Sequence, residues 1–179
     1  PPHVLPVLDE AYFEYLPAGS HDGTALLRDG RYLVVMRTFS KAFGLCGLRV
    51  GYGIGSQSWI RALDAVRQPF NTNQLAQVAA LESLRHPAAI QARVDEAISE
   101  RDRVSAALRE MGVPFTPSHG NFILMQPPDP GSEARVLHEA LLKRGVIVRD
   151  GSALGCPGTL RVTIGAPSEN DAFLAALAA

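Results

Sequence analysis

Apolar residues in the first part of the chain gather in short continuous runs separated by turn residues. The clearest run, at 31–38, is rich in Val and Leu; a second, at 4–9, is broken by Pro6 and ends at Asp9; a third, at 48–55, is punctuated by glycine. Continuous runs of this length are typical of strands buried on both faces of a parallel sheet. The pattern therefore predicts strands of an α/β sheet.

Beyond residue 55 the apolar residues recur every three or four positions, which predicts helices. Ser56 would cap a helix whose apolar face holds Trp59, Ile60, Leu63 and Val66. Asn71, Thr72 or Asn73 would cap a second, with Leu75, Val78, Ala79 and Leu81 on its apolar face. A long helix is expected at about 87–111, where Gly112 stops it.

After the long helix the elements become short and varied. We expect a strand at 121–125, a helix from a Ser132 cap to Arg144 with Gly145 at the C′ position, strands in VIVRD and TLRVTIG, and a closing helix with a capping box of Ser168 and Asp171. Residues 1–85 are interpreted as the latter part of a large α/β domain with a mainly parallel sheet. Residues 86–179 are interpreted as a small C-terminal α+β domain that the long helix enters.

Composition and charge are those of an ordinary globular protein. Of the 179 residues, 46% are hydrophobic and 20% are charged, and 17 Lys and Arg nearly cancel 18 Asp and Glu. This balance gives no support to a nucleic-acid or membrane partner, and no apolar run is long enough to span a bilayer. Cys46 and Cys156 match no metal or disulfide pattern, so we expect two buried or half-buried thiols in a cytoplasmic protein.

The first residues, PPHVLPVLDEAY, read as the interior of a longer protein because they open without Met on a strand-like run. We therefore expect this chain to be part of a longer one, with exposed sheet edges and an incomplete site when isolated.

The stretch RTFSKAFGLCGLRVGY places a lysine and an arginine in one loop between two strands. Lys41 follows Thr38 and Ser40, and Arg49 comes eight residues later, beside glycines. A desolvated lysine can form a Schiff base with an aldehyde, and a guanidinium can bind a phosphate in a forked geometry. The loop suits a phosphorylated aldehyde, although each cation taken alone is more readily a solvated loop residue beside an edge strand.

Two further side chains fall near the same edge of the predicted sheet. Asp9 ends the first strand, and Tyr12 lies three residues beyond it. Ligands of parallel α/β sheets bind at the carboxyl ends of the strands, where Asp9 and the loop after Thr38 would both lie. Taken alone, Asp9 is as readily a turn or cap carboxylate, and Tyr12 is as readily a packing residue.

DEAY, followed about thirty residues later by TFSKAFGLCGLRVGY, closely resembles the class I/II aminotransferases, which are pyridoxal-phosphate-dependent enzymes of fold type I. The resemblance extends through PFNTNQLAQ, HGNFIL, GVIVRD and LRVTIGAPSEN, and it is greatest to histidinol-phosphate aminotransferases. It implies the fold-type I architecture, with this chain as its C-terminal part.

The resemblance also implies roles for individual residues. Lys41 would hold pyridoxal 5′-phosphate as a Schiff base and act as general acid and base. Asp9 would pair with the pyridinium nitrogen and Tyr12 with the ring hydroxyl oxygen, while the phosphate would be bound by Thr38, Ser40 and Arg49.

Substrate contacts would come from the second part of the chain. By resemblance Arg161 binds the anionic group of the substrate, and Asn121 matches a position near it. Arg149 could bind a substrate phosphate or pair with Asp150, two alternatives that stay open. No residue pattern indicates a metal site.

The resemblance predicts transamination between histidinol phosphate and 2-oxoglutarate, in histidine biosynthesis, by a homodimer whose PFNTN segment contributes to the subunit contact. The alternatives are an aromatic or other amino-acid aminotransferase and, more distantly, a phosphothreonine decarboxylase. A different class, a transcription regulator that senses the coenzyme through this fold, would carry a DNA-binding module upstream.

Overall fold

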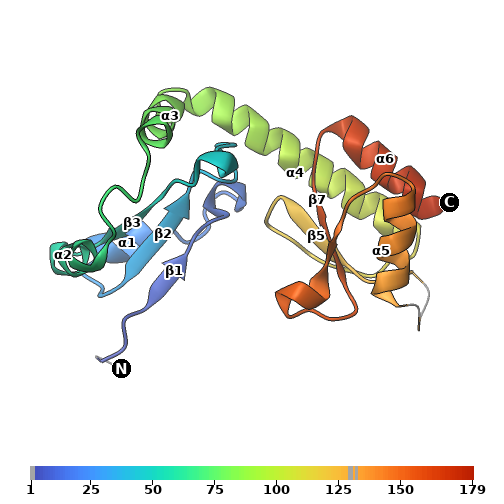
Figure 1. Ribbon diagram of the computed structural model, residues 1–179, viewed down its shortest axis with the longest axis horizontal. Helices are drawn as coiled ribbons and strands as arrows, with labels where there is room; N and C mark the ends of the chain where they lie inside the picture. Colours follow the sequence, from blue (N-terminus) through green and yellow to red (C-terminus); the bar gives the residue numbers. More distant parts are fainter. Residues whose placement is uncertain (1–2, 129–130, 132) are drawn as a thin grey trace. The chain divides into compact units, whose positions relative to one another are not determined.

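The computed structural model of the chain describes residues 3–128, 131 and 133–179 (Figure 1). The chain divides into two compact units, Pro1–Arg93 and Val94–Ala179, which we call unit 1 and unit 2. The division falls within the long helix α4 (Pro87–Glu110), which agrees with the expected helix at about 87–111.

Unit 1 is built on a sheet with the strand order β1-β2-β3, formed by β1 (Val7–Asp9), β2 (Val34–Thr38) and β3 (Gly51–Gly55). The strands β1 and β2 pair in parallel, as expected, whereas β3 runs antiparallel to β2. The described part of the sheet is therefore mixed rather than mainly parallel. The reason is that β3 follows β2 through a loop rather than a crossover helix, so the chain returns in the opposite direction.

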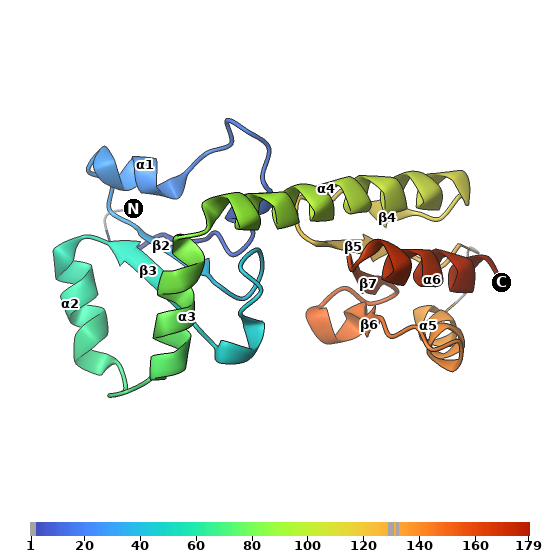
Figure 2. The same cartoon turned by 90° about the horizontal axis from the view of Figure 1, so that it is seen from above.

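Helices cover both faces of this sheet. Figure 2 shows α1 (Gly23–Arg28) on one side, with α2 (Gln57–Val66) and α3 (Gln74–Leu84) on the other. Asn73 caps α3 as expected, because its side chain accepts a hydrogen bond from Ala76 N at 2.8 Å. Ser56 occupies the cap position of α2, but its hydroxyl bonds to the Ser58 hydroxyl instead.

The apolar residues predicted for α2 and α3 lie on these helices, but most of their side chains are exposed in this chain. The exposed residues include Leu63, Val66, Leu75, Val78 and Leu81. The buried residues of α3 are Ala76 and Ala80, which pack against Phe39 and Val50. Small residues face inward on α3 because they let the rings of Phe39 and Phe43, in the loop between β2 and β3, approach the helix closely.

Unit 2 is a four-stranded antiparallel sheet with the order β4-β5-β7-β6. Its strands are β4 (Phe115–Thr116), β5 (Phe122–Met125), β6 (Arg149–Asp150) and β7 (Leu160–Thr163). The helices α5 (Ala134–Lys143) and α6 (Pro167–Ala178) complete it, with the C-terminal part of α4. The elements expected from the sequence are all present, and β4 is an addition.

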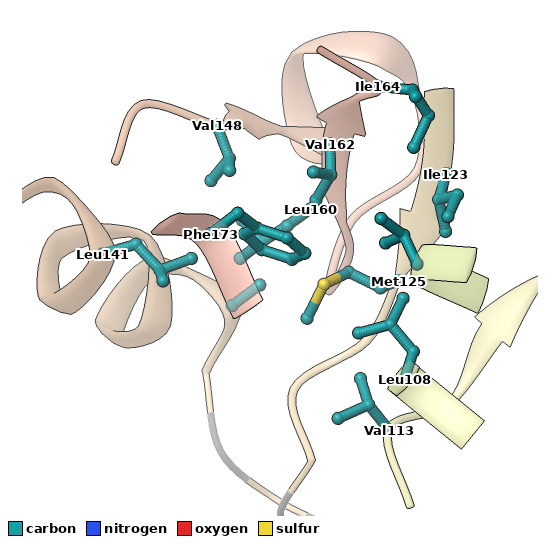
Figure 3. Close-up of a cluster of buried hydrophobic side chains, with 12 residues drawn as sticks. Leu108, Val113, Ile123, Met125, Leu141, Val148, Leu160, Val162, Ile164 and Phe173 are labelled. Atoms are coloured by element: carbon teal, nitrogen blue, oxygen red, sulfur yellow. The ribbon is translucent and has the colours of Figure 1, made fainter. Parts of the chain in front are cut away.

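One face of the unit 2 sheet carries its hydrophobic core (Figure 3). Ile123, Met125, Leu160 and Val162 alternate inward from β5 and β7 and are almost wholly buried. Leu108 of α4, Leu141 of α5 and Phe173 of α6 close over them. The opposite face of β5 and β7 is left to the side chains that alternate with these core residues.

The helix ends of unit 2 test the expected caps. Ser132 lies outside the described residues, and Glu133 occupies the cap position of α5. Gly145 follows α5 with φ +80°, the left-handed C′ conformation that was expected. The capping box of Ser168 and Asp171 is wrong, because α6 begins at a proline and Glu169 accepts the hydrogen bond from Ala166 N.

A polar cluster joins α4 to the start of α6. Glu100 accepts two hydrogen bonds from Arg103, at 2.9 and 2.7 Å, and a third from the Asn170 amide at 2.7 Å. Asn170 also bonds to the main chain of Gly165, and Arg103 pairs with Asp171. The cluster fixes the turn between β7 and α6 to the surface of α4.

The two thiols are free; Cys46 is exposed rather than buried, and Cys156 is half-buried. Within the described ranges no helix combines the length and apolarity that a membrane span requires. The same ranges hold no cluster of three or more His, Cys, Asp or Glu side chains arranged for a metal ion.

Candidate active site

The strands of unit 1 bring two predicted site residues to one edge and one face of the sheet. Asp9 is the last residue of β1, Thr38 is the last residue of β2, and these neighbouring strands run parallel. Asp9 pairs in register with Met36, so Asp9 and Thr38 lie on the same face because strand side chains alternate. The candidate site therefore lies at the adjacent carboxyl ends of β1 and β2.

The loop between β2 and β3 is held by its own main chain. Phe39 N donates to Val50 O at 3.2 Å, and Leu45 N donates to Phe39 O at 2.9 Å. Gly44 N donates to Lys41 O, and Gly44 adopts φ +72° at this tight turn. The backbone around Lys41 is therefore a closed, hydrogen-bonded turn rather than a free loop.

Apolar side chains anchor one side of the same loop. Phe39 and Val50 are buried, and Phe43, Leu45 and Leu48 pack around them against α3. The Asn73 amide also donates to Leu48 O at 3.3 Å. Because the apolar residues of the loop are held against α3, its polar residues are left to bond with one another, as Thr38, Ser40 and Arg49 do.

Lys41 lies beside Tyr12, as the predicted site requires. Its Nζ is 5.3 Å from the centroid of the Tyr12 ring, and both side chains are partly buried. The ammonium group can be attracted to the face of the ring, and no carboxylate within the described part of the chain forms an ion pair with Lys41. The arrangement is compatible with an amine that reacts with an aldehyde.

Arg49 and Ser40 form a candidate anion site. Arg49 Nη1 donates to Ser40 Oγ at 3.3 Å and to Cys46 O at 2.9 Å. Arg49 does not open β3 as expected; it ends a short 3-10 helix with φ +55°, a left-handed conformation that costs about 1–2 kcal/mol for a non-glycine residue. Thr38 Oγ1 accepts from Ser40 N at 3.0 Å, which leaves its hydroxyl proton available to an anion.

The Asp9 carboxylate takes part in a turn. Its Oδ1 accepts a hydrogen bond from Ala11 N at 3.0 Å, which is the turn role that the sequence also allowed. The carboxylate is exposed at the end of β1. An exposed carboxylate with one oxygen in a turn can still accept a hydrogen bond from a ring N–H through its other oxygen.

Two of the remaining predicted residues, Arg149 and Arg161, lie in unit 2 on the face of its sheet that points away from the core. Arg149 of β6 and Arg161 of β7 occupy directly paired positions on antiparallel strands. Like charges at such positions repel each other, so a shared anion would stabilise them. Arg161 lies over the Phe122 ring at 5.3 Å, and its Nε is buried with no hydrogen-bond partner among the described residues.

Two neighbouring residues bear on the alternatives left open. The Asp150 carboxylate accepts from Ser152 N at 2.8 Å, and this bond holds the pKa of Asp150 below its usual range. Asp150 is therefore engaged in capping the following 3-10 helix, while the Arg149 side chain is exposed. Asn121 precedes β5, where its main-chain oxygen accepts from Ile164 N at 2.9 Å.

Two charged residues of unit 1 that were not predicted as site residues flank the predicted ones. Glu10 follows Asp9, Arg37 precedes Thr38, and the two side chains form a partly buried ion pair at 2.8 Å. The sequence feature that could have indicated this pair is Arg37, a charged residue in an otherwise apolar strand.

The functional groups of unit 1 fit a phosphorylated aldehyde coenzyme. The amine of Lys41, the guanidinium and hydroxyl of Arg49 and Ser40, and the carboxylate of Asp9 match an aldehyde, a phosphate and a protonated ring nitrogen respectively. In unit 2, Arg161 offers a guanidinium whose buried Nε has no hydrogen-bond partner among the described residues.

Known proteins resemble the chain along nearly its whole length. It is 46% identical to a histidinol-phosphate aminotransferase of Geobacillus thermodenitrificans over 172 residues. The aligned region covers 96% of this chain and 46% of that protein. It is 45% identical over 174 residues to an aromatic amino acid aminotransferase of Mycobacteroides abscessus, covering 97% of this chain and 48% of that protein. The chain spans about half the length of the curated relatives it matches.

A solved structure agrees with the fold. The histidinol-phosphate aminotransferase of Sinorhizobium meliloti, in complex with pyridoxal-5′-phosphate, superposes with a TM-score of 0.87 at 28% identity and covers 99% of this chain and 48% of its own. The profile of the family "Aminotransferase class I and II" matches residues 2–177. The chain therefore belongs to the class I and II aminotransferase family and has the fold of the fold-type I enzymes.

Proposed function

We propose that the protein carrying this chain is a pyridoxal-phosphate-dependent aminotransferase that acts on histidinol phosphate and 2-oxoglutarate. The observation that carries the proposal is the loop after β2, which presents the Lys41 amine beside Tyr12 and the Arg49 guanidinium on Ser40. Family membership and the relatives that act on histidinol phosphate support it.

In this proposal the residues of unit 1 hold the coenzyme. Pyridoxal phosphate supplies, when bound, an aldehyde and an electron-withdrawing ring. Lys41 would hold the coenzyme through its amine and, once the substrate amine has displaced it, would take a proton from the substrate Cα as general base. Arg49, Ser40 and Thr38 bind the phosphate, whereas Asp9 holds the proton on the ring nitrogen and Tyr12 donates to the ring oxygen.

Arg161 is assigned to the anionic group of the substrate. Its Nε is buried and has no hydrogen-bond partner among the residues that the structure describes. A buried guanidinium donor left unsatisfied costs about 1–3 kcal/mol, which an anion would recover. Arg149, paired across the strands with Arg161, is assigned to the phosphate of histidinol phosphate, and Asn121 to a neighbouring contact. A dianionic group accounts for two facing arginines better than a single carboxylate does.

The experiment that tests the substrate compares histidinol phosphate with phenylalanine as amino donor to 2-oxoglutarate in the full-length protein. A preference for the phosphate ester supports the proposal. Equal or better use of phenylalanine would favour the second candidate, an aromatic aminotransferase, for which the Mycobacteroides abscessus relative speaks.

A transcription regulator with the same fold is tested more simply. The residues that precede this chain in the full-length sequence would show a winged-helix pattern in a regulator and further strands and helices of the large domain in an enzyme. The near-neutral charge of the chain gives the regulator no support.

We also propose that the protein is a homodimer in the cytoplasm. The end of α2, the start of α3 and the loop between them expose apolar side chains, with Val66 at 81%, Phe70 at 100% and Leu75 at 75% of full exposure. A groove of about 950 Å³, lined in part by Phe39, Phe70 and Leu81, runs beside this segment. An exposed apolar surface of this kind supports a protein contact.

A further inference from the structure

Arg37 lies at the centre of a charge cluster in unit 1 that the proposed chemistry does not use. Its Nε and Nη2 donate to Glu10 Oε2 at 3.0 and 2.8 Å, and Nη2 also donates to Asp22 Oδ1 at 2.8 Å. The side chains of Arg37 and Glu10 retain only 13% and 12% of their exposure. The cluster is therefore a partly desolvated network rather than a surface salt bridge.

An aromatic ring completes the contacts of Arg37. The guanidinium carbon lies 3.7 Å from the centroid of Phe13, at the start of the 3-10 helix that follows Tyr12. A guanidinium can stack on a ring and fork onto a carboxylate at the same time, which an ammonium group cannot do.

Three members of this cluster, Glu10, Phe13 and Arg37, are adjacent in sequence to proposed coenzyme residues. Glu10 follows Asp9, Phe13 follows Tyr12, and Arg37 itself precedes Thr38. Glu10 and Arg37 alternate with Asp9 and Thr38 along their strands, so the cluster lies on the opposite face of the sheet. The Arg37 guanidinium thus connects the three segments that carry Asp9, Tyr12 and Thr38, and it does so on the other face of the sheet.

The cluster also ties these segments to α1. Glu10 Oε1 accepts a hydrogen bond from Gly23 N at 2.7 Å, and Asp22 caps α1 through Thr24 N. A Cβ at Gly23 would meet Glu10 Oε1 and Val35 at 2.7 and 2.9 Å, so the helix start is pressed against the sheet. Loss of Arg37 would leave two carboxylates facing each other with no cation between them.

We propose that Arg37 is a positioning residue for the coenzyme site, acting through Glu10 and Phe13 to hold Asp9 and Tyr12 in register with the loop after Thr38. The inference rests on the proposed function, because it presumes that these residues bind pyridoxal phosphate. Arg37 does not touch the coenzyme; it sets where the groups that do so are held.

The test uses the full-length protein with Arg37→Met, Arg37→Lys and Glu10→Gln. Arg103→Met is the matched control, because it also removes an arginine that forks onto a carboxylate, Glu100, but in unit 2. The measured quantities are the dissociation constant of pyridoxal phosphate from the apoprotein, the pH midpoint of the bound coenzyme's visible absorbance, and the melting temperature.

We expect Arg37→Met to weaken coenzyme binding by about ten- to a hundredfold, the range found when residues that orient a site's ligands are removed. The pH midpoint should shift as well, because Asp9 no longer faces the ring nitrogen correctly. Arg37→Lys and Glu10→Gln should show smaller changes in the same direction. Arg103→Met should lower the melting temperature but leave affinity and pH midpoint unchanged.

If Arg37→Met does not fold, the Arg37→Lys and Glu10→Gln proteins decide the question. A coenzyme affinity and pH midpoint equal to wild type in these folded variants, or a matching change in Arg103→Met, would overturn the positioning role. Absence of coenzyme absorbance in the wild-type protein would instead overturn the proposed function, and the inference with it.

Discussion

Lys41 Nζ lies 5.3 Å from the centre of the Tyr12 ring, although the two residues belong to separate segments that follow the neighbouring strands β2 and β1. The contact exists because β1 and β2 run parallel and release their chains at the same edge of the sheet. The contact is the geometric basis of the first prediction, which follows from the proposed assignment of the Lys41 amine to the coenzyme aldehyde.

Lys41→Ala should abolish the visible absorbance that pyridoxal phosphate gives when bound to the full-length protein, and transaminase activity with it. The reason is that alanine offers no amine to the aldehyde. Titration with the coenzyme, followed by absorbance, measures the effect. Lys143→Ala is the control, because Lys143 is the other lysine of the chain and is exposed on α5. An unchanged spectrum in Lys41→Ala would contradict the assignment.

Arg49→Gly should separate coenzyme affinity from stability. The substitution removes a charge-assisted contact worth about 1.5–3 kcal/mol, so affinity should fall about ten- to a hundredfold. Glycine also tolerates the φ of +55° at this position, so the apoprotein should melt no lower than wild type. Arg49→Ala should lose affinity equally and melt lower. Wild-type affinity in both variants would remove Arg49 from the phosphate site.

Arg161→Ala and Arg149→Ala should differ in their effect on substrate choice. Arg161→Ala should lower kcat/KM for every amino donor by about ten- to a hundredfold, because it removes the principal anion contact. Arg149→Ala should lower it only for the phosphorylated donor. Steady-state kinetics with histidinol phosphate and phenylalanine measure both. Equal losses for the two donors in Arg149→Ala would show that Arg149 does not recognise the phosphate.

Acid should weaken unit 2 partly through Glu100. Hydrogen bonds from Arg103 and then Asn170 hold the pKa of the Glu100 carboxyl below its usual value. A carboxylate with a depressed folded pKa contributes stability above its unfolded pKa of about 4.3, and that contribution is lost as the pH falls through the folded value. Melting curves from neutral pH down to about pH 3 should therefore show a smaller acid-induced loss in Glu100→Gln than in wild type.

Glu96→Gln serves as control for that experiment, because Glu96 is an exposed residue of the same helix. It should keep the wild-type pH dependence. A Glu100→Gln protein with the full wild-type acid loss would show that other groups govern the transition.

Phe70→Asp should weaken the proposed homodimer of the full-length protein. A charge would replace the Phe70 ring, which is fully exposed in this chain and lies in the loop between α2 and α3. Sedimentation over a range of protein concentrations measures the dissociation constant. Arg85→Asp, at the exposed C-terminal end of α3, is the comparison, and identical dissociation constants in the two variants would argue against this segment as the contact.

The sequence by itself determined most of the elements, with α1 and β4 as exceptions, and most of the candidate chemistry. The apolar runs, the Asn73 cap and the glycine at 145 act within a few residues, so their meaning does not depend on the rest of the fold. The motif around Lys41 placed the chain in its family for the same reason, because its residues are contiguous.

Only the tertiary structure decided which surfaces meet. The buried face of α3 consists of Ala76 and Ala80 rather than its larger residues, because the ring of Phe39 needs the room. Arg37 and Glu10 pair across 27 positions, a contact that no local pattern encodes. Such choices depend on packing between distant segments, whose free energy is shared among many partners and is set only when the sheet and its helices assemble.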